Sequence, residues 1–426
     1  MDRFLFVAVL VAMMMGLALH HASQVAAPVR TQIPAQSATQ GVTESAGETP
    51  GGAGRAGFYA RIVPLAQREG EVEVYSYAAS FPPFWERAVI PGFERKYGIK
   101  VRFFNSRSGI ADHQLEAQRE FGRPAPTDVY FAPRGHLDFY VRHDLASHID
   151  LASALPEAGA LARARLRDLP PDGYFVPFHV NQSALAIDDA YFASTAATAP
   201  ATLEELLNWA VAHPKKFALT SPRYGGSGGA FLIAVANHFM DPPCRAAFFS
   251  HSMTADAARN WVAHSGCLDG TWRYFKQLYP VSEVTRGNAD TQNLLANRAA
   301  AMGTVWEDWS YTFIKYKLLQ PTLRLSVVPS GMPGSADVLF VASGARHPAA
   351  AMLLIDYLLS APMQQWKLDE LRSRSARTDV VAASRDAASA GNMLPVSLDG
   401  LALPWPPAAT MEALGSEFAR QVVIGQ

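Results

Sequence analysis

The chain carries almost no net charge. Its 37 lysines and arginines balance 38 aspartates and glutamates, so the formal charge over 426 residues is -1 at pH 7. A protein without a strong basic field has no bulk attraction for nucleic acid or for an anionic membrane surface, so neither partner is expected. With 49% hydrophobic and 18% charged residues, the composition is that of a globular protein. The length predicts about two or three domains.

Cysteine is also scarce. Only Cys244 and Cys267 occur, so there is no lipobox cysteine for a lipid anchor. His136, His143 and His148 lack the Cys/His partner set of a metal site, and we expect neither a metal nor a cofactor. In a reducing compartment the two thiols would be inert and buried. In an exported chain an even count favours a disulfide, whose loop closure would contribute about 3 kcal/mol.

One apolar run stands at the N-terminus, at residues 4–19, after the single basic residue Arg3. As a helix it would span roughly 24 Å, less than the ~30 Å hydrocarbon core of a membrane, which favours a signal peptide over residues 1–27. An uncleaved membrane anchor is the alternative. Residues 28–70 are expected to form a flexible leader, because residues 22–57 contain almost no large apolar side chains.

The rest of the chain alternates between strand and helix patterns. The first strand is predicted at residues 71–78, followed by a helix at 84–97, a strand at 101–105, a helix at 110–121 and a strand at 128–132. Strands separated by helices are typical of parallel sheets with right-handed crossovers, so the fold class is α/β. Later candidates are an extended segment at 174–188, a capping box of Thr202 and Glu205, strands at 216–221, 301–305 and 323–328, and helices at 230–240, 271–279 and 290–299.

Residues 336–366 are the segment of the sequence that is most informative about the protein family. They predict a strand, a turn at Gly344, a helix beginning at Pro348 and a second helix after Ser360. This sequence resembles a late segment of the extracellular solute-binding proteins of ABC importers (family 1-like), in which "HP-x-AA" opens a helix that ends "DYLLS-x-x-x-Q". The matching residues are His347, Pro348, Ala349, Ala350, Asp356, Tyr357, Leu358, Leu359, Ser360 and Gln364.

That resemblance implies a two-lobed periplasmic binding fold of type II, in which each lobe is a mixed, mainly parallel sheet flanked by helices. One lobe would hold residues 71–180 and 330–426, the other residues 181–329. Open α/β sheets bind ligands beyond the carboxyl ends of their strands, so we expect a solute in the cleft between two lobes that close by a hinge. The positions that the resemblance assigns to this cleft are Tyr77, Ser80, Ser106, Arg107, Asp128, His179 and Asn181.

A glycine-rich loop at residues 221–229 follows a predicted strand and opens a helix. Its backbone N–H groups and the helix dipole favour an anion, with Ser221, Ser227 and Gly228 as contacts. Tight packing of the loop is the alternative. The loop also fits the G-x-S-x-G pattern of a nucleophile elbow, so a serine hydrolase is a rival interpretation, with the later partners Asp337 and His347.

Residues 306–309, Trp-Glu-Asp-Trp, follow another predicted strand. Two indoles beside carboxylates can hold an organic cation through Trp306, Glu307 and Trp309, each contact contributing roughly 0.5–2 kcal/mol. Alternatively the acidic pair favours a helix start while the tryptophans pack. A polyamine- or thiamine-like cation would use this cluster, whereas a phosphorylated or anionic solute would use Ser106, Arg107 and the glycine loop.

We therefore expect an extracytoplasmic solute-binding component of an ABC importer, which captures a small polar solute and performs no chemistry. Its partners would be the solute and an ABC permease in the inner membrane. The protein would act in the periplasm as a monomer. A serine hydrolase and a ligand-binding partner of a membrane sensor are the alternatives.

Overall fold

The computed structural model describes residues 52–106, 108–163, 166, 169–223, 226–250, 252–384, 393–396, 398 and 400–424. The predicted signal peptide and the first part of the predicted leader lie outside the described residues. Contacts divide the chain into Met1–Thr49 and a compact unit, Pro50–Gln426, and only the second unit is described below. Within it, no described helix is both long and apolar enough to cross a membrane.

A first group of strands begins with three parallel neighbours. β1 (Glu71–Ser76) pairs with β2 (Lys100–Asn105) on one side and with β3 (Val129–Ala132) on the other. β9 (Met332–Val341) joins β3, and β4 (Val176–Asp188) joins β9, both in antiparallel fashion. The order β2-β1-β3-β9-β4 confirms the predicted strand–helix alternation and its parallel pairing.

A second group of strands continues from β4. β7 (Met302–Trp306) pairs with β4 in antiparallel fashion, and β5 (Phe217–Thr220) lies parallel between β7 and β6 (Glu283–Thr285). β8 (Leu323–Ser326) also pairs with β4. Two-residue strands complete the pairing: β10 (Arg374–Ser375) on β4 and β11 (Ala402–Leu403) on β9.

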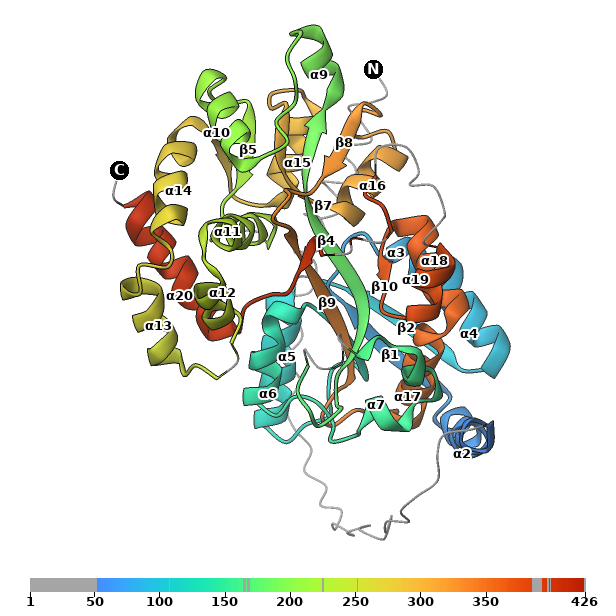
Figure 1. Cartoon of the computed structure of the whole chain (residues 1–426). Coiled ribbons are helices and arrows are strands. Elements are labelled where there is room, and N and C mark those ends of the chain that lie inside the picture. The colour runs from blue at the N-terminus through green and yellow to red at the C-terminus, as the bar shows by residue number, and fades with distance from the viewer. Residues whose placement is uncertain are drawn as a thin grey trace, which may run out of the picture. The chain divides into compact units, whose positions relative to one another are not determined.

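β4 is the strand that joins the two groups. Its residues 176–182 pair with β9, whereas residues 183–188 pair with β7 and β8. All 13 of its residues are buried, as expected of a strand covered on both faces. Figure 1 shows β4 and β9 running side by side through the middle of the molecule. The predicted extended segment at residues 174–188 is therefore confirmed as a crossing strand.

Helices cover both groups of strands (Figure 1). Those before β4 are α2 (Gly52–Glu69), α3 (Pro82–Phe84), the π-helical turn η1 (Trp85–Val89), α4 (Ile90–Tyr97), α5 (Ser108–Glu120), η2 (Arg134–His136), α6 (Leu137–Arg142), α7 (Leu151–Ala154) and η3 (Pro156–Ala160). Those between β4 and β9 are α9 (Asp189–Ser194), α10 (Leu203–Ala212), α11 (Gly226–Phe239), α12 (Pro242–Phe248), α13 (Ala255–His264), α14 (Asp269–Val281), α15 (Asn288–Ala296) and α16 (Glu307–Lys315). After β9 come α17 (Pro348–Leu359), α18 (Ala361–Leu371), α19 (Thr378–Ser384), α20 (Ala408–Phe418) and η4 (Ala419–Val423).

Local sequence signals explain where several helices begin. Thr202 and Glu205 form the predicted capping box of α10, in which the side chain of each residue accepts a hydrogen bond from the backbone N–H of the other. Pro348 occupies the first turn of α17 as predicted, and Gly344 precedes that helix in a left-handed conformation with φ 79°. These signals lie within a few residues of the structure that they determine, so they are readable from the sequence.

The predicted leader is wrong from residue 52 onward. α2 buries Phe58, Ile62 and Ala66 in the core of the first strand group. These residues recur every four positions and so lie along one helical face, and the Tyr59 hydroxyl donates to Asp356 of α17 at 2.5 Å. The surrounding Gly, Ala and Gln residues, and a proline inside the helix, obscured this apolar stripe.

The C-terminal residues also differ from the expected division. Residues 330–426 were assigned to the first lobe, yet Leu414 and Phe418 of α20 are buried in the core of the second strand group. Met393 and Leu398 pack in a satellite core on the same group. Apolar burial therefore attaches the chain from residue 393 onward to the second group, and we propose the lobe boundaries with that change.

The predicted disulfide is present. Cys244 of α12 and Cys267, just before α14, are bonded with their Cα atoms 5.7 Å apart. The bond closes a loop of 23 positions that includes α13.

Candidate functional site

Two of the predicted contacts, Tyr77 and Ser80, lie just after the carboxyl end of β1. Tyr77 follows β1 directly, and its hydroxyl donates to the Asp337 carboxylate on β9. Asp337 also accepts from the backbone N–H of Arg134 at 2.8 Å. Burial, followed by the nearby Asp337 charge, raises the pKa of Tyr77 well above its usual value, so this phenol stays protonated as a donor.

Ser80 connects the first strand group to the second. Its hydroxyl donates to Asp308 Oδ2 of α16 at 3.1 Å, and His179 Nε2 of β4 lies 3.8 Å from the same oxygen. Asp308 is 2% exposed, and its Oδ1 has no partner among the described residues. Burial is the main cause that raises the pKa of Asp308 to about 7. Asp308 lies within the Trp-Glu-Asp-Trp motif and is a site candidate that sequence reasoning missed, because sequence alone does not tell which of two adjacent carboxylates faces the other strand group.

His179 is a neutral, fully packed side chain. Its Nδ1 lies 2.6 Å from Ser373 Oγ, which also accepts from Lys367 Nζ at 2.9 Å. Burial, together with the Lys367 charge, lowers the pKa of His179 well below its usual value. Burial likewise lowers the pKa of Lys367. Ser80, Asp308, His179, Ser373 and Lys367 therefore form one buried polar cluster beside the crossing strand.

Glu307 differs from its predicted role. Its carboxylate accepts from Arg374 Nε at 2.7 Å, and both side chains are buried. Arg374 also donates to the backbone carbonyls of Val396 and Pro395 at 2.6 and 2.8 Å. Burial raises the pKa of Glu307, and the Arg374 charge opposes that shift. An acid already paired with a guanidinium has little attraction left for an organic cation, so this pairing argues against the cation site predicted at Glu307.

The two tryptophans of the motif have separate environments. Trp306 ends β7 and is only 9% exposed, since Trp405 stacks on it with ring centroids 6.4 Å apart and an interplanar angle of 22°. Trp309 stacks on Phe313 one turn later in α16. The pair therefore does not form a cage around one point, and Trp405 is a site candidate that sequence reasoning missed.

Asn181 occupies the middle of the crossing strand. It is 9% exposed, and its Oδ1 has no hydrogen-bond partner among the described residues. Two positions further along β4, Ser183 lies opposite Trp306 in the antiparallel register. Side chains at alternate positions, and those directly opposite, share one face of a sheet, so Asn181 lies on the face that carries Trp306.

The described residues of the glycine-rich segment pack tightly, and Ser227 is not exposed as a nucleophile. Ser227 is fully buried, with Oγ 2.6 Å from Asn288 Oδ1 and 3.2 Å from the Thr304 carbonyl. A Cβ at Gly228 would meet the Thr220 carbonyl oxygen at 1.8 Å, so this glycine is required by close approach. Ser221 is buried, and its Oγ accepts from the backbone N–H of Arg223 at 3.4 Å.

The hydrolase partners are also placed elsewhere. His347 Nδ1 lies 2.9 Å from Asp128 Oδ2, and Asp337 is engaged by Tyr77. A nucleophile elbow needs the serine exposed and within hydrogen-bond reach of its base. Ser227 meets neither condition, so the predicted elbow is wrong.

Asp128 lies away from the other predicted contacts. It lies before β3, at the end opposite to the strand's carboxyl terminus, and it accepts from the backbone N–H groups of Glu73, Arg346 and His347 at 2.8–2.9 Å. Asp128 thus stabilises the turn ahead of α17. Ser106 is exposed at the end of β2, and Arg107 lies outside the described residues.

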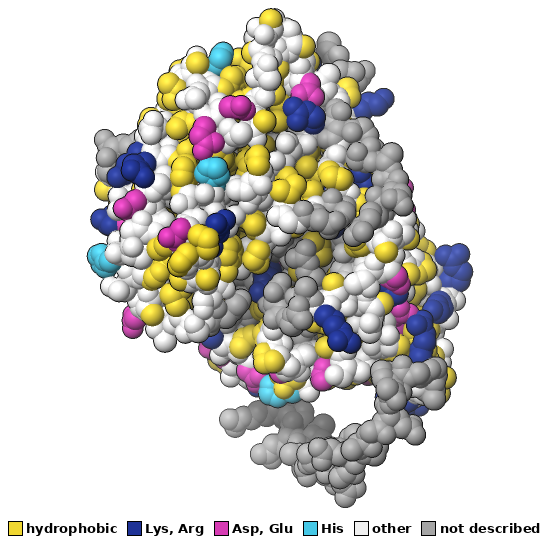
Figure 2. Space-filling view, viewed as in Figure 1, with side chains coloured by type: hydrophobic (Ala, Val, Ile, Leu, Met, Phe, Trp, Pro, Cys, Tyr) yellow, Lys and Arg dark blue, Asp and Glu magenta, His cyan; other side chains and the backbone are white. Residues whose placement is uncertain are grey.

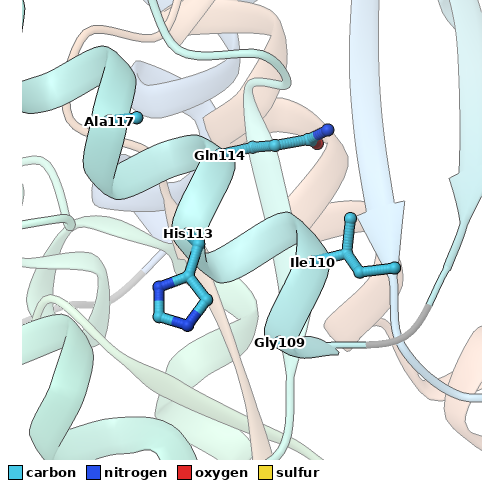
Figure 3. A pocket seen from close by; sticks show the side chains of 5 residues that line it. All are labelled: Gly109, Ile110, His113, Gln114 and Ala117. Atoms are coloured by element: carbon cyan, nitrogen blue, oxygen red, sulfur yellow. The ribbon is translucent and has the colours of Figure 1, made fainter.

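An open hollow of about 720 Å³ lies along α5, directly after these two positions. Figure 3 shows Ile110 and Gln114 projecting from one side of the helix, whereas His113 projects from the other. Its lining is completed by Gly109 and Ala117. None of the predicted contacts that the structure describes lines this hollow. On the face seen in Figure 2, basic and acidic side chains are interspersed, in keeping with the balanced net charge.

Comparison with known proteins identifies the family of this chain. The family model described as bacterial extracellular solute-binding protein matches residues 88–395. A search of curated proteins found no match.

Three solved structures illustrate the likeness in fold. The GacH receptor of Streptomyces glaucescens, studied unliganded and with acarbose, has a TM-score of 0.63 and 15% identity, covering 83% of this chain and 98% of the receptor. An ABC transporter structure from Clostridium perfringens has a TM-score of 0.61 and 12% identity, covering 83% and 99%. The spermidine/putrescine substrate-binding protein PotD from Streptococcus pneumoniae has a TM-score of 0.60 and 12% identity, covering 82% and 99%.

Proposed function

This chain belongs to the family of bacterial extracellular solute-binding proteins, and we propose that it captures a small polar solute between its two lobes for an ABC importer. The observation that carries the proposal is the crossing strand β4. It places Asn181 and the Ser80–Asp308 contact where the two strand groups meet. A hinge at this strand would let the lobes open and close on a solute.

The contacts of Glu307 and of the glycine-rich segment bear on the charge of the solute. A cation was favoured because Glu307 stood between two tryptophans, but Arg374 neutralises that carboxylate. An anion would need Arg107, outside the described residues, or N–H groups of a loop whose serines are already engaged. A neutral polar solute is therefore supported best, held by Asn181 and by aromatic contact with Trp405.

The partner and the location follow from the family. The named relatives include substrate-binding components of ABC transporters, so the proposed partner is a membrane permease of that class. We propose the periplasm as the compartment, and the disulfide between Cys244 and Cys267 supports an oxidising environment outside the cytosol. The family and the buried position of Ser227 both support a binding protein that performs no chemistry.

Mass spectrometry of material released on denaturation tests the proposal. Protein purified from its native host is expected to release one small solute in near-equimolar amount, and calorimetry should then show that solute binding again to the emptied protein. Asn181→Ala should weaken that binding by about fivefold, since a hydrogen bond contributes about 1 kcal/mol. Asn208→Ala, at an exposed position on α10, is the matched control. Equal affinity in both variants would contradict the proposed site.

A further inference from the structure

The chain beyond residue 393 crosses the molecule as an arm, which we define as residues 393–396, 398 and 400–407. In Figure 1 the red segment ahead of α20 runs from the middle of the molecule, where β11 pairs with β9, to that helix. β11 within the arm pairs in parallel with the start of β9, and the Met332 backbone N–H donates to the Leu401 carbonyl at 2.9 Å. A Cβ at Gly331, whose φ is 87°, would meet that carbonyl oxygen at 2.8 Å. The arm is therefore fixed closely against the crossing strands.

Arg374 holds the beginning of the arm to both strand groups. It belongs to β10, which pairs with the first half of β4, and it donates to the carbonyls of Pro395 and Val396. Its remaining Nε donor goes to Glu307 at the start of α16. A guanidinium has five donors in a rigid fork, and here they join three separate segments. The arm thus begins at the junction of the lobes.

The arm then places Trp405 over the carboxyl ends of β5 and β7. Trp405 stacks on Trp306, the last residue of β7, and the edge of Trp306 abuts Gly226, at which a Cβ would lie 2.9 Å from Cζ2. Met411, just after the arm, lies 3.8 Å from a Cβ position at Gly229. Because Trp306 is 9% exposed while Trp405 stays half-buried, a solute above these strands meets the Trp405 ring first.

Two buried polar atoms, one on the arm and one on β4, lack partners among the described residues. They are the Nε1 donor of Trp405 and the Oδ1 acceptor of Asn181. Asn181 lies on the face of β4 that carries Trp306, the ring on which Trp405 stacks. An unpaired buried donor or acceptor destabilises a protein, and a ligand that carries both kinds of group would satisfy these two atoms.

We propose that the arm forms one wall of the binding site and that the solute is an uncharged, ring-bearing molecule that stacks on Trp405. The inference rests on the proposed function and adds the substrate class to it. The ring would be a pyranose or a nitrogen heterocycle, since both have a flat or apolar face and carry hydrogen-bond donors and acceptors on the rim. The family match ends at residue 395, so Trp405 is a feature of this chain rather than of the matched range.

The test is a binding screen with two matched sets of solutes. The ring-bearing set is D-glucose, D-galactose, adenosine and cytidine, and the acyclic set is glycerol, spermidine, putrescine and glycerol 3-phosphate. Binding is measured by the shift in melting temperature and then by calorimetry on the full chain. A ring-bearing member is expected to bind most tightly and to quench tryptophan fluorescence.

Three variants separate the ring from the fold. Trp405→Leu keeps an apolar side chain but loses the ring, and should weaken binding of the best ring-bearing probe by about tenfold. Trp405→Phe keeps a ring without Nε1, and should show an intermediate loss. Trp261→Leu, at a half-buried tryptophan of α13, is the control and should bind as the unaltered protein does.

Each outcome decides the inference. A ring-bearing probe that depends on Trp405 supports it. An acyclic probe that binds most tightly, or a ring-bearing probe that binds Trp405→Leu as well as Trp261→Leu, overturns the ring-stacking wall and leaves the solute-binding function intact. Failure of every probe in both sets overturns the proposed substrate class, whereas the proposed function fails only if protein from its native host releases no solute.

Discussion

Asp308 makes the stability of the protein depend on pH in a way that one substitution should remove. The carboxyl group lies between Ser80 of the first strand group and its own helix, with His179 close by and the Glu307 and Asp337 charges raising its pKa further. Burial is the main cause that raises the pKa from 3.8 to about 7. In the folded protein the group therefore holds its proton at pH values where the unfolded chain has lost it.

The sign follows from proton binding. Between pH 3.8 and about 7 the folded state binds more protons than the unfolded state, so stability falls as the pH rises through that window and is level above it. The full loss is about 4 kcal/mol, of which about 2.5 kcal/mol falls between pH 5 and pH 8. Asp308→Asn keeps an oxygen for the Ser80 hydroxyl and cannot ionise.

Urea unfolding at pH 5 and pH 8 measures this difference. The free energy of unfolding of the unaltered protein should drop more between the two values than that of Asp308→Asn, by about 2–3 kcal/mol. Asp138→Asn, at an exposed carboxylate on α6, is the control and should behave as the unaltered protein. Identical pH dependence in Asp308→Asn and the unaltered protein would refute the assignment of a raised pKa to this buried group.

Four further predictions concern other parts of the structure. Glu307→Gln should lower the free energy of unfolding by about 3 kcal/mol in chemical denaturation, because it leaves the Arg374 charge buried without its partner, and an unchanged value would disprove the pairing. Replacing both Cys244 and Cys267 by serine should lower it by about 3 kcal/mol, and no loss under oxidising conditions would count against the bond. Phe58→Ala should cost about 3–4 kcal/mol because α2 is part of the core, whereas a free leader would tolerate the change. The unaltered protein and Ser227→Ala should both hydrolyse esters only at the background rate. Hydrolysis by the unaltered protein that Ser227→Ala lacks would restore the hydrolase interpretation.

Local patterns carried most of the fold prediction. Alternating strands and helices, the Thr202–Glu205 capping box and the Pro348 helix start each depend on neighbours within a few residues, and the structure confirms them. The crossing strand could be predicted from the apolar residues of the segment at 176–188, and all thirteen of its residues are buried in the structure. The stripe of α2 was missed because small residues and a proline surround its apolar positions.

The site was harder to predict because its chemistry depends on distant partners. Glu307 looks available in the sequence, and only the structure brings it to Arg374, 67 positions later. Asp128 is similarly taken by backbone groups more than 200 positions away. Trp405 stands in a proline-rich stretch with no periodicity, so nothing local indicates that it stacks on Trp306. Composition and spacing do not report such pairings.

The most direct measurement of the central claim is a crystal structure of the protein with the solute released from native material. The account predicts that the solute lies between the two strand groups, within hydrogen-bond reach of Asn181 and against the ring of Trp405. A solute found on an outer face, with neither residue in contact, would contradict it.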